Sequence, residues 1–107
     1  MSCLPIAVVS YDYPLSPEGS KHFLSQAERW LRESLSWAGA IEHRVYRSAD
    51  GTSPLVTVAT VYDTLENALA IMPAASKLAM EMRAYGATNI EMRVLAPSPV
   101  YPDPIKA

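Results

Sequence analysis

Residues 41–62 have the sequence IEHRVYRSADGTSPLVTVATVY, and this stretch decides the fold. Two runs rich in β-branched and aromatic residues, 41–48 and 55–62, flank a short polar segment. Asp50-Gly51 in that segment is a strong turn signal, so the stretch is predicted to form a β-hairpin. Its first strand also holds the densest polar group of the sequence, where any activity is to be sought first: Glu42, His43, Arg44, Tyr46 and Arg47.

A strand and a helix are predicted before this hairpin. Residues 4–12 are apolar on both alternations, which is typical of a strand covered on both faces. Ser16 is placed to cap a helix that has Pro17 at its first position and Glu18 in its first turn. The apolar stripe of this helix is predicted to run to residue 38, with Gly39 as the stop.

A second helical region and a last strand are predicted after the hairpin. Asp63 and Glu66 have the spacing of a capping box, and Pro73 should break or kink the helix that follows. Residues 88–96 alternate in polarity as an edge strand does. Prolines from 97 onward cannot donate to a sheet, so we expect a domain at 1–96 and a proline-rich C-terminal arm at 97–107.

The predicted order of elements is β-α-β-β-α-β, the α+β arrangement of ferredoxin-like folds. It implies a four-stranded antiparallel sheet with both helices on one face and the first and third strands in the centre. Several apolar side chains of those central strands would then lie on the other face, and burying each is worth about 1.5–3 kcal/mol. An exposed apolar patch of this kind marks an interface, so a second copy or some other layer is expected to cover it, with a homodimer through the non-helical sheet face as the expected assembly.

The element order, the EHRVY strand at 42–46, the YDTLENA passage at 62–68 and the break at Pro73 resemble the dimeric α/β-barrel superfamily. Members include antibiotic-biosynthesis-type monooxygenases and stress-responsive barrel proteins. The resemblance implies that two sheets face each other in a homodimer. It also implies a ligand pocket between each sheet and its helices or within the barrel.

Composition excludes several classes of function. The 107 residues carry nine basic and eleven acidic side chains, a formal net charge of -2, so no nucleic acid or membrane partner is expected. The strand centres hold Val8 and Val58 where RNA-recognition modules need aromatic residues. Cys3 is the single cysteine, which favours a cytoplasmic location. No metal-ligand spacing or phosphate loop is present, so no cofactor is expected.

The candidate site residues are His43, Arg44, Tyr46, Tyr62 and Arg93. His43 shares an alternation with apolar residues, so a hydrogen-bonded core or edge histidine is preferred over a general base. Arg44 and Arg93 belong to Glu-x-Arg pairs, which are either ion pairs at a rim or anchors for a substrate oriented by Tyr46 or Tyr62. Six aromatic residues are further candidates to line a pocket, with core packing as the alternative: Tyr11, Tyr13, Tyr46, Tyr62, Trp30 and Trp37.

Two functions remain open on these residues. The first is a homodimeric α/β-barrel enzyme, monooxygenase-like and cofactor-independent, acting on a small aromatic or carbonyl compound. The alternative is a non-catalytic dimeric module that binds a ligand or has a structural role. A barrel interior completely filled by side chains would favour the second.

Overall fold

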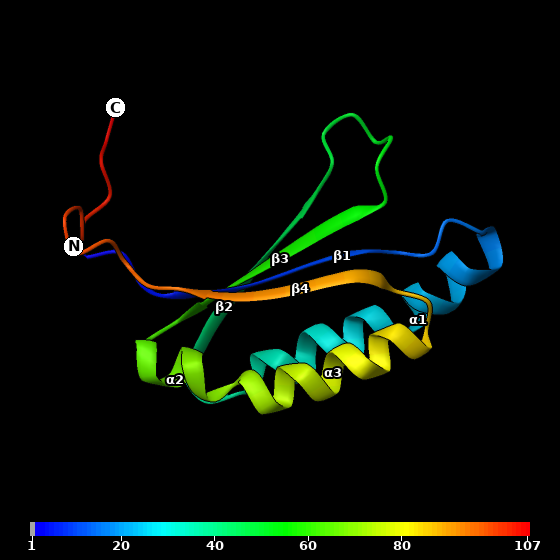
Figure 1. The fold of residues 1–107 in the computed structure, drawn as a ribbon, viewed down its shortest axis with the longest axis horizontal. Helices are drawn as coiled ribbons and strands as arrows, with labels where there is room; N and C mark the ends of the chain where they lie inside the picture. Colours follow the sequence, from blue (N-terminus) through cyan, green and yellow to red (C-terminus); the bar gives the residue numbers. More distant parts are fainter. Residues whose placement is uncertain (1) are drawn as a thin grey trace.

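The computed structural model of the protein describes residues 2–107 and has the expected order of elements (Figure 1). The β-α-β-β-α-β prediction is confirmed, with the second helical region divided in two. The elements are β1 (Ile6–Asp12), α1 (Pro17–Leu35), β2 (Ala40–Arg47), β3 (Leu55–Tyr62), α2 (Leu65–Ala70), α3 (Met72–Ala84) and β4 (Thr88–Leu95).

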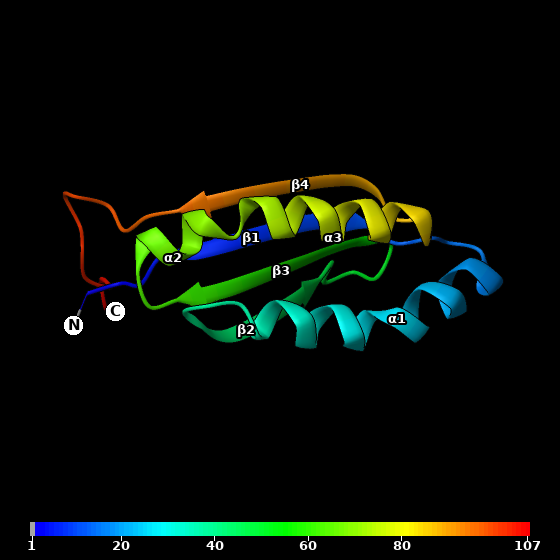
Figure 2. The same ribbon diagram turned by 90° about the horizontal axis from the view of Figure 1, so that it is seen from below.

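The four strands form one antiparallel sheet in the order β2-β3-β1-β4, so β1 and β3 are central as predicted. All three helices lie on the same face of this sheet. Seen from that face, α1 runs along β2 and β3 while α2 and α3 run along β1 and β4 (Figure 2). The two-layer arrangement leaves the opposite face without a helix.

Helix α1 begins where the sequence predicts and ends earlier. Ser16 Oγ accepts a hydrogen bond from the backbone N–H of Gly19 at 3.0 Å, which satisfies one of the open donors of the first turn. The expected end at residue 38 is wrong, because the helix stops at Leu35 and Ser36 is its C-cap. Residues 36–39 form a tight turn into β2 instead, and Gly39 adopts a φ of 85° within it.

The break at Pro73 is confirmed as the junction of two helices. Pro73 occupies the first turn of α3, where its missing N–H leaves no intrahelical bond unmade. The predicted capping box at Asp63 is wrong by one residue, since Thr64 is the N-cap of α2 and accepts from the backbone N–H of Asn67 at 3.1 Å. Asp63 accepts from the Asn67 side chain instead, at 2.9 Å.

The strand register decides which face each side chain takes. Ala7 pairs with Thr60 and Val9 with Met92, and these four side chains point toward the helices. The core divides there into two clusters, one around Phe23 and Trp30 and one around Tyr62. The opposite alternation, which includes the cross-strand pairs Ile6–Val61 and Val8–Ala59, lies on the face without helices.

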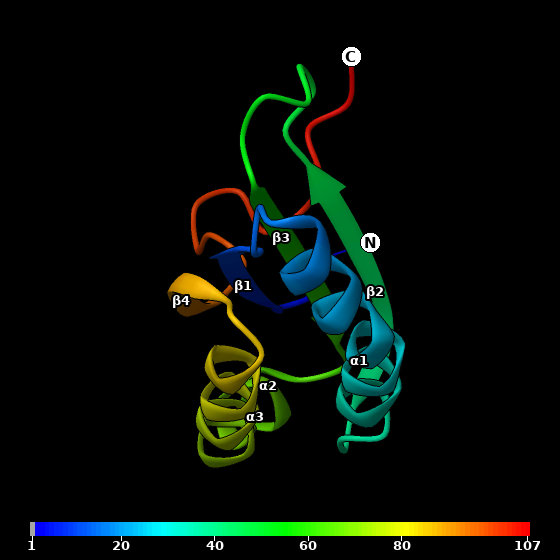
Figure 3. The ribbon, with the colours of Figure 1, turned by 90° about the vertical axis from the view of Figure 1, so that its right-hand side faces the viewer.

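The hairpin loop at 48–54 and the C-terminal arm both rise on the side of the sheet that lacks helices (Figure 3). Residues 96–107 contain neither helix nor strand. The arm turns back to the start of the chain, where the backbone N–H of Cys3 donates to the Pro102 carbonyl at 2.7 Å. The division at residue 96 stays a prediction.

Candidate functional site

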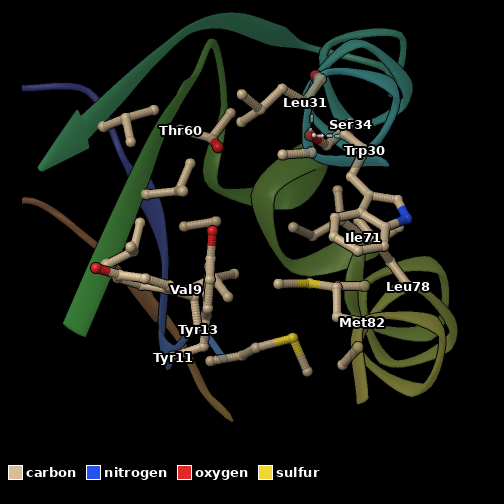
Figure 4. A pocket seen from close by; sticks show the side chains of 18 of the residues that line it. Val9, Tyr11, Tyr13, Trp30, Leu31, Ser34, Thr60, Ile71, Leu78 and Met82 are labelled. Atoms are coloured by element: carbon tan, nitrogen blue, oxygen red, sulfur yellow. Dashed lines mark hydrogen bonds between the residues drawn. The ribbon is translucent and has the colours of Figure 1, made fainter. Parts of the chain in front are cut away.

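A cavity of about 250 Å³ lies between the sheet and helices α1 and α3 (Figure 4). Most of its wall is apolar and comes from strand residues such as Val9 and Val58 and helix residues such as Leu78 and Met82. A dry apolar cavity of about 150 Å³ is already able to take up benzene. The cavity therefore has room for a small aromatic ligand.

Tyr62 is a lining residue of this cavity and has an unpaired hydroxyl. Its side chain is completely buried, and its Oη has no hydrogen-bond partner. Leaving a buried polar group unpaired costs about 1–3 kcal/mol, which an acceptor atom of a ligand or a bound water would offset. Burial raises the pKa of the Tyr62 hydroxyl, so it stays protonated and available as a donor at neutral pH.

The indole of Trp30 has a different environment. Its Nε1 also lacks a partner within hydrogen-bonding geometry, yet it lies close enough to Glu81 to influence that carboxylate. The pKa of Glu81 is lowered mainly by its hydrogen bond with Arg29 and further by Trp30. Because the indole nitrogen of Trp30 points away from the strand side chains in Figure 4, we assign the polar group available to a ligand to Tyr62.

His43 is held by hydrogen bonds on both ring nitrogens. Its Nδ1 lies 2.7 Å from Thr60 Oγ1, and its Nε2 lies 2.9 Å from both Ser34 Oγ and the Leu31 carbonyl oxygen. The Leu31 carbonyl only accepts, so we assign the proton of neutral His43 to Nε2 and let the Thr60 hydroxyl donate to Nδ1. His43 therefore joins β2 to β3 and α1, as expected of a hydrogen-bonded edge histidine.

Replacing His43 by alanine is expected to lower the free energy of unfolding by about 2–3 kcal/mol, because the buried Thr60 hydroxyl loses its partner and the links from β2 to α1 are removed. Urea denaturation followed by circular dichroism measures this change. Lys21→Ala, at an exposed position of α1, is the control and should change stability by less than about 0.5 kcal/mol. Equal stabilities for the two variants would show that the network contributes nothing.

The opening of the cavity is marked by three lining residues that are exposed to solvent, Leu24, Val45 and Arg47. Arg47 Nη2 donates to Tyr13 Oη at 2.8 Å, and its guanidinium carbon lies 5.3 Å from the centre of the Tyr13 ring. In Figure 4, Thr60 and Ser34 lie at one end of the cavity, and Tyr11 and Tyr13 lie at the other.

The structure separates the residues that sequence patterns grouped as one site. His43 and Tyr62 face the helices, whereas Arg44, Tyr46 and Arg93 lie on the non-helical face. Arg44 and Arg93 occupy one row of the sheet, but two strands lie between them, so their backbones are roughly 14 Å apart. Tyr62 therefore does not orient a substrate group held by Arg44.

The two arginines of the non-helical face have acidic partners on their own strands. Arg44 Nε lies 3.1 Å from Glu42 Oε2, and Arg93 Nη2 lies 3.6 Å from Glu91 Oε2. All four side chains are about half exposed or more, so each pair is worth about 0–1 kcal/mol. The positions fit ion pairs at a rim, and a role for any of these residues in function stays a prediction.

Five of the six aromatic candidates line the cavity, namely Tyr11, Tyr13, Trp30, Trp37 and Tyr62. Tyr46 is the exception, lying on the other face with 55% of its surface exposed. Arg47 was expected in the polar group of the first hairpin strand but not among the candidate site residues, and Thr60 and Ser34 were not expected at the site. The signal for Arg47 was present, because it follows His43 and Val45 on one alternation of β2.

Comparison with solved structures shows what this fold is similar to. A protein named as a candidate antibiotic biosynthesis monooxygenase from Deinococcus radiodurans matches with a TM-score of 0.71 and 10% identity, covering 97% of this chain and 98% of that chain. A mutant of SnoaB, a cofactor-independent oxygenase from Streptomyces nogalater, matches with a TM-score of 0.64 and 17% identity, covering 92% and 97%. No family model and no curated protein sequence matches.

A dimeric ferredoxin-like protein from an uncultured marine organism also matches, with a TM-score of 0.60 and 17% identity over 86% of this chain and 85% of that chain. The chain therefore has the ferredoxin-like fold of antibiotic-biosynthesis-monooxygenase-like proteins, and the predicted resemblance is confirmed at the level of fold. Within residues 2–107, no helix is long and apolar enough to cross a membrane. The cytoplasmic location stays a prediction.

Proposed function

We propose that the protein binds a small aromatic or carbonyl compound in the cavity between its sheet and helices and oxidises it without a cofactor, as a monooxygenase-like enzyme. The observation that carries the proposal is the apolar cavity, whose lining residues include Tyr62 with its buried and unpaired hydroxyl. A ligand oxygen beside Tyr62 would accept the hydrogen bond that the protein leaves unmade. The fold shared with SnoaB, named as a cofactor-independent oxygenase, supports the same reading.

The chemistry needs no electron source beyond the substrate. When an aromatic C–H of a naphthol becomes a quinone carbonyl, one atom of O2 enters the ring, the other leaves as water, and the naphthol supplies all four electrons. The form that reduces O2 is the electron-rich naphtholate, which forms when the naphthol gives its proton to water at the opening of the cavity. Tyr62 stabilises it by donating a hydrogen bond to its oxygen, in a site whose low dielectric strengthens that bond.

The test uses 1-naphthol, whose product would be 1,4-naphthoquinone. With a chelator present and no flavin added, the protein should accelerate oxygen uptake and quinone formation above the rate in buffer. Tyr62→Phe should reduce the rate at least about tenfold, because one donor to a charged oxygen is lost. Tyr46→Phe, on the opposite face of the sheet, is the matched control and should leave the rate unchanged.

The second candidate is a non-catalytic ligand-binding module, favoured by the absence of a free base. Among the residues of the described chain that line the cavity, Arg47 is the only charged one, and the neighbouring His43 has both ring nitrogens engaged. Binding of 1-naphthol without any oxygen uptake would select this function. Absence of binding would contradict both candidates.

We further propose that the protein is a homodimer through the non-helical face of its sheet. Apolar side chains of the central strands, including Ile6, Val8 and Val61, lie on that face, and no helix covers it (Figure 3). The hairpin loop and the C-terminal arm rise on the same side, where they would flank a second copy. The structural neighbour named as a dimeric ferredoxin-like protein supports this assembly.

A further inference from the structure

Arg47 is the one charged side chain among the residues of the described chain that line the cavity. It belongs to the last position of β2 and pairs in register with Val56, so it shares the helix-facing side of the sheet with Val45 and Val58. Its neighbours Leu24 and Val45 are exposed lining residues at the opening. A permanent positive charge is therefore placed where a ligand would enter an otherwise apolar space.

The guanidinium of Arg47 has no acidic partner. Four other arginines of the described chain form ion pairs, whereas no carboxylate in residues 2–107 lies within 4.0 Å of Arg47. Its contacts are with Tyr13, a hydrogen bond of 2.8 Å to Oη and the ring beneath the guanidinium at 5.3 Å. A guanidinium has five N–H donors, so most of them remain open to a ligand.

We propose that the ligand of this cavity is an aryl carboxylate, whose ring system enters the apolar space while its carboxylate binds Arg47 at the opening. This inference rests on the proposed use of the cavity and adds the charge of the ligand. A planar guanidinium and a planar carboxylate form two parallel hydrogen bonds, a geometry that a neutral amide does not match. Tyr13 holds the guanidinium in place beforehand, which limits the ordering required on binding.

The chemistry of the opening favours a monoanion over a phosphate. A phosphate dianion would need further cations or backbone donors, and the other exposed residues of the opening, Leu24 and Val45, are apolar. A flat aromatic body is favoured because rings from both layers face the space, including those of Tyr11 and Trp30. One charge at the opening and an apolar interior therefore select an amphipathic acid.

Two probes of nearly the same shape test this proposal: 2-naphthoate and its neutral analogue 2-naphthamide. Fluorescence titration at low salt should show that the wild-type protein binds naphthoate about tenfold more tightly than naphthamide. Arg47→Met should abolish that difference by weakening naphthoate alone, and Arg47→Lys should restore part of it. Arg44→Met is the matched control, since Arg44 lies on the same strand and the opposite face.

Each outcome separates this inference from the proposed use of the cavity. Equal affinity for the two probes, or naphthoate binding that survives Arg47→Met, would overturn the assignment of an anionic ligand and leave the cavity as the binding site. Loss of naphthoate binding in Arg44→Met but not in Arg47→Met would move the anion site to the non-helical face and also overturn it. Failure of both probes to bind would contradict the proposed use of the cavity itself.

Discussion

Val8→Lys is expected to disrupt the proposed dimer and leave the protein as a monomer. Val8 lies on central strand β1, on the non-helical face, with Ala59 opposite it on β3 and Arg93 opposite it on β4. A lysine there would place a second cation beside Arg93. Its ammonium group would also lose its hydration in the interface, and both costs would apply to each of the two copies. The dissociation constant of the dimer should rise at least about 100-fold.

Sedimentation velocity at micromolar concentration measures this change, and circular dichroism shows whether the variant stays folded. Val8 is partly exposed in the single chain, so the monomer should retain its fold. Met80→Lys is the control, because Met80 is 68% exposed on α3, on the far side of the molecule from the proposed interface. A wild-type protein that sediments as a monomer at these concentrations would refute the assembly.

Val58→Phe is expected to abolish binding of 1-naphthol and 2-naphthoate while the protein stays folded. Val58 points from the middle of β3 into the cavity, where Val45 is its cross-strand neighbour. A phenyl ring at this position would occupy space that the ligand needs. Filling an existing cavity adds apolar contacts, and Phe is favourable in a strand, so the midpoint of thermal unfolding should not fall.

A graded series makes this experiment decisive. Val58→Ile adds one methylene and should weaken binding only a few-fold, since it leaves most of the 250 Å³ free. Val58→Phe should reduce affinity at least about 100-fold, beyond the range of a fluorescence titration at micromolar protein. Undiminished binding in Val58→Phe would place the ligand outside this cavity. If Val58→Phe instead caused a large drop in thermal stability, a loss of binding would not show where the ligand lies. Ala27→Leu on α1 would then provide the same test from the opposite wall.

Local patterns in the sequence were sufficient for the elements and their order. The Ser16-Pro17 start of α1, the break at Pro73 and the Asp50-Gly51 turn all depend on backbone chemistry within a few residues. The predicted end of α1 at residue 38 was wrong, because the apolar stripe continues to Ala38 while the backbone already turns at Ser36. There Trp37 packs beside the Tyr62 cluster instead of extending the helix.

Alternation along a strand also determined the face that each residue takes. His43 was expected beside apolar residues and Arg44 on the opposite face, and the strand register agrees. The same rule, applied four residues beyond His43, places Arg47 on the helical side. The sequence by itself thus determined the fold class, the uncovered sheet face and the sides that His43 and Arg44 take.

Only the tertiary structure decided which of these residues meet. Alternation gives the face of a residue but not its distance from residues on other strands. In the folded sheet, Arg44 and Arg93 lie on opposite edge strands, and Tyr62 lies on the opposite face from both. Whether space remains between sheet and helices depends on how side chains from β1, β3, α1 and α3 pack, a property of many distant residues at once. For that reason the cavity, the unpaired hydroxyl of Tyr62 and the open guanidinium of Arg47 become visible only in the folded chain.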